Sequence, residues 1–195
     1  MSKSKLIATA SVVAALAFSG IANATEYVVS AYDNSIADGP AGGVATLNVT
    51  SGEHLSVFTP TTDIWNAGAL PRWSNANGLI GNLYATGSDA SGEPAGTLIG
   101  TNFGDTTQDG YTAPFGSLVG EIGGVYQLLG TSFKGTAWAT GTLYLYYWDS
   151  NYGDNSGAIT SSVEVPEPAT WALMLVGFGG VGALLRRRAA TAPAT

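Results

Sequence analysis

Hydrophobic and polar residues alternate over short stretches throughout the middle of the chain. In many of these stretches β-branched or aromatic residues occupy every second position, and Gly, Asn, Asp and Ser separate one stretch from the next. This pattern is typical of strands that are half-buried in a sheet. It predicts strands at residues 26–32, 44–50, 54–59, 81–86, 117–122, 125–129, 142–148 and 158–165. Because only the two ends of the chain look helical, the central region is predicted to be all-β, a β-sandwich or jelly roll.

Residues 87–115 interrupt this pattern with few apolar residues and many turn formers. A flexible linker and a long surface loop across one end of the sandwich are both compatible with this composition. Leu98, Ile99, Tyr111 and Phe115 offer apolar anchors, which favours the ordered loop. Long ordered loops commonly carry function.

Residues 1–24 have the order of a secretory signal peptide. Lys3 and Lys5 form a basic start, an apolar run follows, and Ala22-Asn23-Ala24 provides small residues on both sides of a cleavage position. Signal peptidase is expected to cut between Ala24 and Thr25. The protein is therefore predicted to be exported.

The C-terminal residues 165–190 contain an uncharged, mostly apolar stretch at 169–185, followed by an arginine cluster at Arg186–Arg188. As a helix this stretch would measure about 25 Å at ~1.5 Å per residue, close to the ~30 Å of a bilayer core. We therefore predict a transmembrane helix at 169–185, whose arginines hold the C-terminus on the cytoplasmic side.

Just before this helix stands Pro166-Glu167-Pro168. The order of Pro-Glu-Pro, apolar segment and arginine cluster closely resembles the PEP-CTERM sorting signal over residues 165–188. This resemblance implies a Gram-negative bacterium with an exopolysaccharide system and an exosortase that cleaves near Pro-Glu-Pro. It implies a precursor anchored in the inner membrane and a mature protein at the cell surface or in the extracellular matrix. Residues 25–164 remain as the β-sandwich domain.

The charge distribution limits the possible partners of this domain. The formal net charge is −7, and only Arg72 and Lys134 among the 7 basic residues lie between the two terminal segments. An acidic domain argues against nucleic acid or anionic lipid as a partner. The absence of cysteine excludes disulfides, zinc thiolate sites and cysteine nucleophiles. His54 has no second histidine to pair with, no G-x-S-x-G occurs, and no pair among the many acidic residues stands out by position as the acids of a glycoside hydrolase. No catalytic residue is therefore predicted, and the protein is expected not to be an enzyme.

One loop concentrates candidate ligands for a metal ion. Residues 148–157, WDSNYGDNSG, place Asp149, Asp154 and Asn155 between two predicted strands. Two carboxylates so close disfavour each other's ionisation, and a divalent cation removes this penalty. Carboxylate, amide and carbonyl oxygens are the ligands that calcium prefers. The alternative is a solvated turn, because Asp, Asn, Ser and Gly are also ordinary turn residues.

The segments 114–130, 136–149 and 152–165 look like the bacterial calcium-dependent galactose-binding lectins. The resemblance implies a small β-sandwich of the galactose-binding, jelly-roll type. It also implies that Asp149, Asp154 and Asn155 bind calcium through their side chains, and that Asn151 falls near a residue that binds calcium through its backbone carbonyl. In these lectins the residues at Asp149 and Asp154 also hydrogen-bond the sugar. The loop before Gly153 is shorter here than in the lectins, and Asp154 stands where they carry Asn.

These inferences predict an exported surface or matrix protein with a calcium-dependent carbohydrate-binding domain, whose partner is an exopolysaccharide. The alternative is a non-catalytic structural protein of the exopolysaccharide matrix, with at most a structural calcium site. Four tryptophans could be either sugar-stacking platforms or core residues, namely Trp65, Trp73, Trp138 and Trp148.

Overall fold

The computed structural model of the chain describes residues 24–165, 177–180, 182 and 186. The chain divides into two units, and the larger one, Ala22–Pro166, contains all the strands described. Most of the predicted signal peptide, the Pro-Glu-Pro motif and most of the predicted helix at 169–185 lie outside the described residues. Residues 177–180, 182 and 186 are helical. Over the part of the chain that the structure describes, no helix is both long and apolar enough to cross a bilayer.

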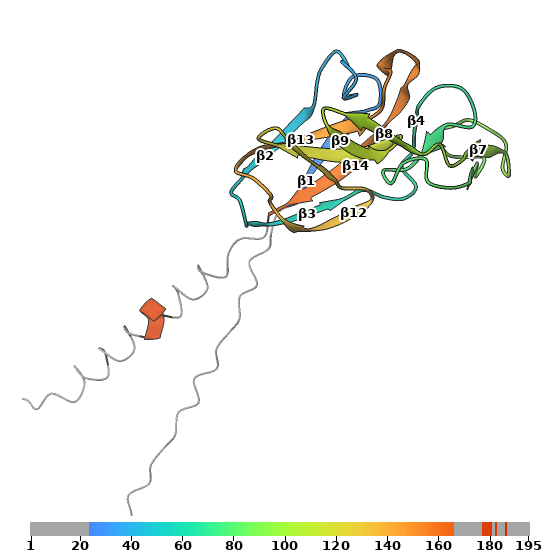
Figure 1. The fold of residues 1–195 in the computed structure, drawn as a ribbon. Helices are drawn as coiled ribbons and strands as arrows, with labels where there is room; N and C mark the ends of the chain where they lie inside the picture. The colour runs from blue at the N-terminus through green and yellow to red at the C-terminus, as the bar shows by residue number, and fades with distance from the viewer. Residues whose placement is uncertain (1–23, 166–176, 181, 183–185, 187–195) are drawn as a thin grey trace, which may run out of the picture. The chain divides into compact units, whose positions relative to one another are not determined.

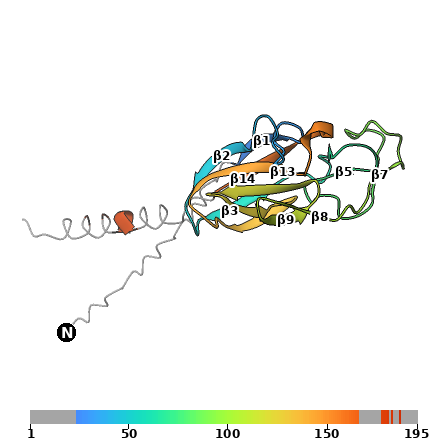
Figure 2. The ribbon, with the colours of Figure 1, turned by 45° about the horizontal axis from the view of Figure 1, so that its top comes forward.

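Two antiparallel sheets form the body of the larger unit (Figures 1 and 2). The first sheet has six strands, namely β1 (Thr25–Ser30), β3 (His54–Phe58), β4 (Trp65–Asn66), β5 (Trp73–Ser74), β12 (Ser132–Thr136) and β14 (Ser156–Glu164). In this sheet β14 pairs with β1 on one side and with β3 and β4 on the other. The second sheet has the order β11-β10-β13-β2, with β2 (Val44–Val49), β10 (Ser117–Ile122), β11 (Val125–Leu128) and β13 (Gly141–Trp148).

Two small hairpins and one short 3-10 helix complete the unit. The small hairpins are β6 (Leu83–Tyr84) with β7 (Leu98–Gly100), and β8 (Asp105–Gln108) with β9 (Tyr111–Pro114). The 3-10 helix η1 (Tyr152–Asp154) lies in the loop between β13 and β14. An isolated bridge between Arg72 and Gly100 connects the segment before β5 to β7.

One hydrophobic core lies between the two sheets. Alternate residues of β13 are fully buried while Tyr144 and Tyr146 are only partly buried, as expected of a strand that covers a core with one face. Both sheets contribute to the core, with Val29, Leu55, Val57, Ile159 and Val163 from the first and Leu118, Ile122, Leu143, Leu145 and Tyr147 from the second. The architecture is therefore an all-β sandwich, which confirms the predicted fold class.

Most predicted strands agree closely with the observed ones, but residues 81–86 and 87–115 differ, and the strands β4, β5 and β12 were not predicted. Residues 81–86 contain only the two-residue strand β6. Residues 87–115 are ordered, as favoured over a flexible linker, but they contain β7 and the β8–β9 hairpin, strands that the sequence did not predict. The apolar anchors act largely as expected, because Ile99 is buried and Phe115 packs against the main core, whereas Leu98 is exposed.

A buried pair of hydroxyl groups joins the end of β3 to β14. Thr59 Oγ1 and Ser161 Oγ lie 2.8 Å apart, and both residues are fully buried. Thr59→Val is expected to lower the free energy of unfolding by about 1–3 kcal/mol, because the Ser161 hydroxyl loses its partner in the core. The double variant Thr59→Val/Ser161→Ala should be more stable than Thr59→Val alone, as measured by urea denaturation. If the losses in the free energy of unfolding of the two single variants simply added up in the double variant, this coupling would be contradicted.

The turn at residues 86–91 depends on one carboxylate. Hydrogen bonds from the Ser91 side chain, and then from Thr86, lower the pKa of Asp89 from 3.8 to about 2. Since the folded pKa lies below the unfolded one, Asp89 stabilises the turn above pH ~3.8, and this contribution disappears as the pH falls through about 2. An NMR titration should place the midpoint of the Asp89 carboxyl signal near 2, with the Thr86 and Ser91 amide signals following it. A midpoint near 3.8 would contradict the proposed turn.

Candidate functional site

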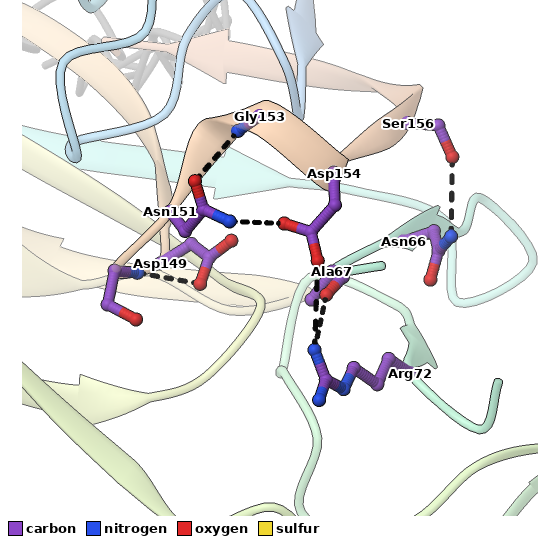
Figure 3. Close-up of polar contacts among 9 residues, drawn as sticks. Asn66, Ala67, Arg72, Asp149, Asn151, Gly153, Asp154 and Ser156 are labelled. Atoms are coloured by element: carbon purple, nitrogen blue, oxygen red, sulfur yellow. Dashed lines mark hydrogen bonds and ion pairs between the residues drawn. The ribbon is translucent and has the colours of Figure 1, made fainter. Parts of the chain in front are cut away.

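The loop between β13 and β14 is positioned by the two strands that border it. Asp149 follows the last residue of β13, and Asn155 immediately precedes β14. Between them the chain forms η1, so the two residues are brought back toward the same end of the sandwich. Figure 3 shows Asp149 and the residues of η1 in this loop. The loop is therefore fixed at both ends by strands whose side chains line the core.

Asn151 organises the turn of η1 with its side chain. Its Oδ1 accepts a hydrogen bond from the Gly153 N–H at 3.1 Å, and its Nδ2 donates to Asp154 Oδ1 at 2.8 Å (Figure 3). The first of these bonds is a helix N-cap. With its side chain engaged in this way, Asn151 can offer a ligand its backbone carbonyl.

Asp149 is a buried carboxylate with an incomplete set of partners. Only 3% of the residue is exposed, and Oδ1 accepts a hydrogen bond from the Ser150 N–H at 2.6 Å. Oδ2 is buried and has no hydrogen-bond partner. Burying a charged oxygen without a partner is costly, so this atom calls for a compensating group.

Asn155 shows the same feature on the other side of the loop. It is 6% exposed, and its Nδ2 donates to the Ala31 carbonyl at 3.1 Å. Its Oδ1, like Asp149 Oδ2, is buried without a hydrogen-bond partner. The Tyr152 ring packs edge-on against Tyr32 at 5.3 Å, so the segment after β1 supports this loop at two points.

The electrostatic surroundings of Asp149 disfavour its charged form. Burial raises the pKa of the Asp149 carboxyl above its usual value, and the nearby charge of Asp154 raises it further. The Ser150 N–H, the Asn155 side chain and the Asn151 N–H act in the opposite direction, but burial is the largest of these effects. A bound cation would favour the ionised form that burial disfavours.

Asp154 is more exposed than Asp149 and faces a positive charge. Its Oδ2 lies 3.8 Å from Arg72 Nη1, with 37% of the Arg72 side chain and 46% of the Asp154 side chain exposed (Figure 3). Arg72 Nη1 also donates to the Ala67 carbonyl at 3.4 Å. Gly68 lies so close to Asp154 Oδ2 that a Cβ there would collide with it. Exposed pairs of this kind contribute only about 0–1 kcal/mol, so Asp154 can exchange this partner at little cost.

A cavity of about 240 Å³ connects these groups. Its walls come from the β13–β14 loop, from the β4–β5 hairpin and from the segments beside β8 and β9, with lining residues Ala67, Arg72, Phe103, Phe115, Asp149, Ser150, Asn151 and Asp154. A larger hollow of about 480 Å³ lies on strands β3 and β12, beside His54 and Lys134, and has no carboxylate in its lining. Of these two hollows, the cavity at the loop combines carboxylates, a cation and aromatic rings.

The structure brings together the residues that the sequence placed in one site. Asp149, Asn151 and Asp154 line the cavity, while Asn155 is buried, is not part of the lining and lowers the pKa of Asp149 through its side chain. Among the described residues, no group of three or more His, Cys, Asp or Glu side chains could hold a metal ion, so any cation here would also need amide and carbonyl oxygens.

The positive and aromatic side chains of the cavity were not predicted as site residues from the sequence. Arg72, Phe103 and Phe115 come from segments that are far from the loop along the chain. The sequence did hold a signal for Arg72, since it is one of only two basic residues between the terminal segments. Of the tryptophans, Trp65 and Trp148 are fully buried, so neither can serve as a sugar platform.

Comparison with known protein families identifies one segment of the chain. Residues 164–188 match the PEP-CTERM protein-sorting motif, which confirms the predicted sorting signal and indicates an exported protein that is sorted to the cell surface. The curated proteins contain no match to this chain. Matching solved structures include one described as "EclA N-terminal domain; PllA-like lectin", at 21% identity, covering 73% of this chain and 98% of that chain with a TM-score of 0.47. Such a distant likeness does not by itself assign a ligand.

Proposed function

We propose that this exported protein binds carbohydrate through a calcium ion held by the loop between β13 and β14, without catalysing a reaction. The observation that carries the proposal is the pair of buried oxygens, Asp149 Oδ2 and Asn155 Oδ1, which have no hydrogen-bond partner. A partnerless carboxylate oxygen and a partnerless amide oxygen are both ligands that a hard divalent cation accepts.

The residues of the loop fit calcium in their chemistry. Asp149, Asp154 and Asn155 would bind through side-chain oxygens, and Asn151 would add its backbone carbonyl. Calcium takes 6–8 oxygen ligands, so positions would remain for two neighbouring hydroxyls of a sugar. Asp149 and Asp154 would also accept hydrogen bonds from these hydroxyls.

The size of the cavity favours a single sugar ring as the bound unit. Its volume of about 240 Å³ lies below the ~300–1,000 Å³ typical of sites for drug-sized ligands. Its lining combines aromatic rings with a few polar groups. We therefore propose recognition of one residue of an exopolysaccharide, at an end or a branch.

The positions of the two ends of the domain support the proposal that the domain is displayed on a surface. Thr25 pairs with Val163, so the chain enters and leaves the sandwich at neighbouring positions. The loop of the site precedes Ser156, at the other end of β14, roughly 25–30 Å away at ~3.3 Å per residue. Signal peptidase would cut before Thr25 and exosortase near Pro166–Pro168, with the 169–185 helix holding the precursor in the membrane. The site would then face away from the point of attachment.

Calorimetry on residues 25–165 tests this function. Calcium is titrated first, and galactose and other simple sugars are then titrated with and without calcium. Binding of calcium together with sugar binding that requires calcium is expected. Calcium binding without any saturable sugar binding would instead indicate a structural matrix protein with a structural ion. No binding of either would overturn the proposal.

A further inference from the structure

We infer that the cavity selects a sugar that carries a carboxylate, such as a uronic acid, and that Arg72 recognises this group. The inference rests on the proposed calcium-dependent function and names the class of sugar. It starts from a feature that calcium binding alone does not require, namely an arginine on the wall of the cavity beside two carboxylates.

Arg72 is held in place by three contacts and still has donors to offer. Nη1 donates to the Ala67 carbonyl at 3.4 Å and lies 3.8 Å from Asp154 Oδ2, and the guanidinium lies over the Phe103 ring at 4.8 Å. The main chain of Arg72 forms a bridge with Gly100. Nε and Nη2 have no hydrogen-bond partner within the described residues 24–165. These two nitrogens form the planar fork that binds a carboxylate through two parallel hydrogen bonds.

The charges of the cavity make this selection depend on the metal. Asp149 and Asp154 carry two negative charges and Arg72 one positive charge, so the lining is negative overall without calcium. One calcium ion reverses the sign to a single positive charge. An anionic sugar would therefore be repelled by the metal-free cavity and attracted by the loaded one, whereas a neutral sugar depends on the metal only through its hydroxyls.

Two phenylalanines provide the apolar wall beside the arginine. Phe103 is 45% exposed, and its ring packs edge-on against Phe115 at 5.3 Å. An exposed aromatic ring on the wall of a polar cavity is available to the apolar C–H groups of a sugar ring. The wall and Arg72 lie in the same cavity as Asp149 and Asp154, so one ring can contact all three kinds of group.

The test compares acid and neutral forms of the same sugar. The calcium-loaded protein is titrated with galacturonate and galactose, and with glucuronate and glucose, at low and high salt. We expect the acid of at least one pair to bind about tenfold more tightly than its neutral form, and this preference to shrink at high salt. Arg72→Gln should abolish the preference, because it lowers the affinity for the acid much more than the affinity for the neutral sugar. Lys134→Gln, which removes the same charge beside the other hollow, should keep the preference.

The outcomes separate this inference from the function on which it rests. Binding of calcium and neutral sugar without preference for the acid would overturn the role of Arg72 and leave the proposed function intact. A preference that persists in Arg72→Gln would also overturn it, because the carboxylate would then bind the ion itself. No binding of calcium or any sugar would overturn both.

Discussion

Replacing Asp149 with alanine is expected to weaken calcium binding by about a hundredfold or more. Asp149 is the most buried carboxylate of the loop, and its Oδ2 has no hydrogen-bond partner in the protein. Changes to residues that only orient metal ligands cost 10–100-fold in affinity, so removal of a charged ligand should reach or exceed the upper end of that range. Calorimetric titration of calcium into the variant measures the loss, and sugar binding should disappear with it.

Two further variants distinguish loss of a ligand from loss of the fold. Asp149→Asn keeps the size of the side chain and removes its charge, and should also lose most of the calcium affinity. Its metal-free form should unfold at a temperature no lower than that of the metal-free wild type at neutral pH, because burial raises the pKa of Asp149 and so makes its charge unfavourable. Asp105→Asn removes the same charge from an exposed position on β8 and should change the calcium affinity less than threefold. Unchanged calcium affinity in Asp149→Ala would contradict the proposed site.

The long strands were predictable because each one repeats the same burial pattern several times. In β13 and β14, which have 8 and 9 residues, buried residues recur three times at alternate positions, so the pattern can be recognised without knowledge of the neighbours. β4, β5 and β6 contain two residues each, too few to show an alternation. Their pairing is decided by strands far away in the sequence, such as β14 beside β4.

The same difference between local patterns and contacts of distant segments explains which part of the site could be predicted from the sequence. Asp149, Asp154 and Asn155 are neighbours in the chain, so their proximity follows from covalent structure. Arg72 and Phe103 reach the cavity through the short strands and the bridge to Gly100, which no local pattern indicates. The sequence therefore predicted an acidic loop, while the positive and aromatic walls became visible only in the folded chain.

Trp65→Ala is expected to lower the free energy of unfolding by about 3–5 kcal/mol, a large part of the ~5–15 kcal/mol typical of a domain. The Trp65 side chain is fully buried, and its ring packs edge-on against Tyr147 at 4.4 Å. Its Nε1 donates to the Gly116 carbonyl at 2.8 Å, which connects β4 of one sheet to the start of β10 in the other. Truncation would open a cavity between the two sheets, and urea denaturation measures the cost.

Trp65→Phe and Trp138→Ala are the matched comparisons for this prediction. Trp65→Phe should cost clearly less than Trp65→Ala, because much of the ring volume remains. In both variants the Gly116 carbonyl keeps its hydrogen bond from Ser74 Oγ at 3.0 Å. Trp138 is only partly buried, so the same truncation there leaves a smaller cavity and should also cost less. If Trp65→Ala were no more destabilising than Trp138→Ala, Trp65 would not hold the sheets together. Trp65 pairs with Gly157, close to Asn155, through the main chain, and this pairing does not depend on the Trp65 side chain. A Trp65→Phe protein that folds should therefore still bind calcium.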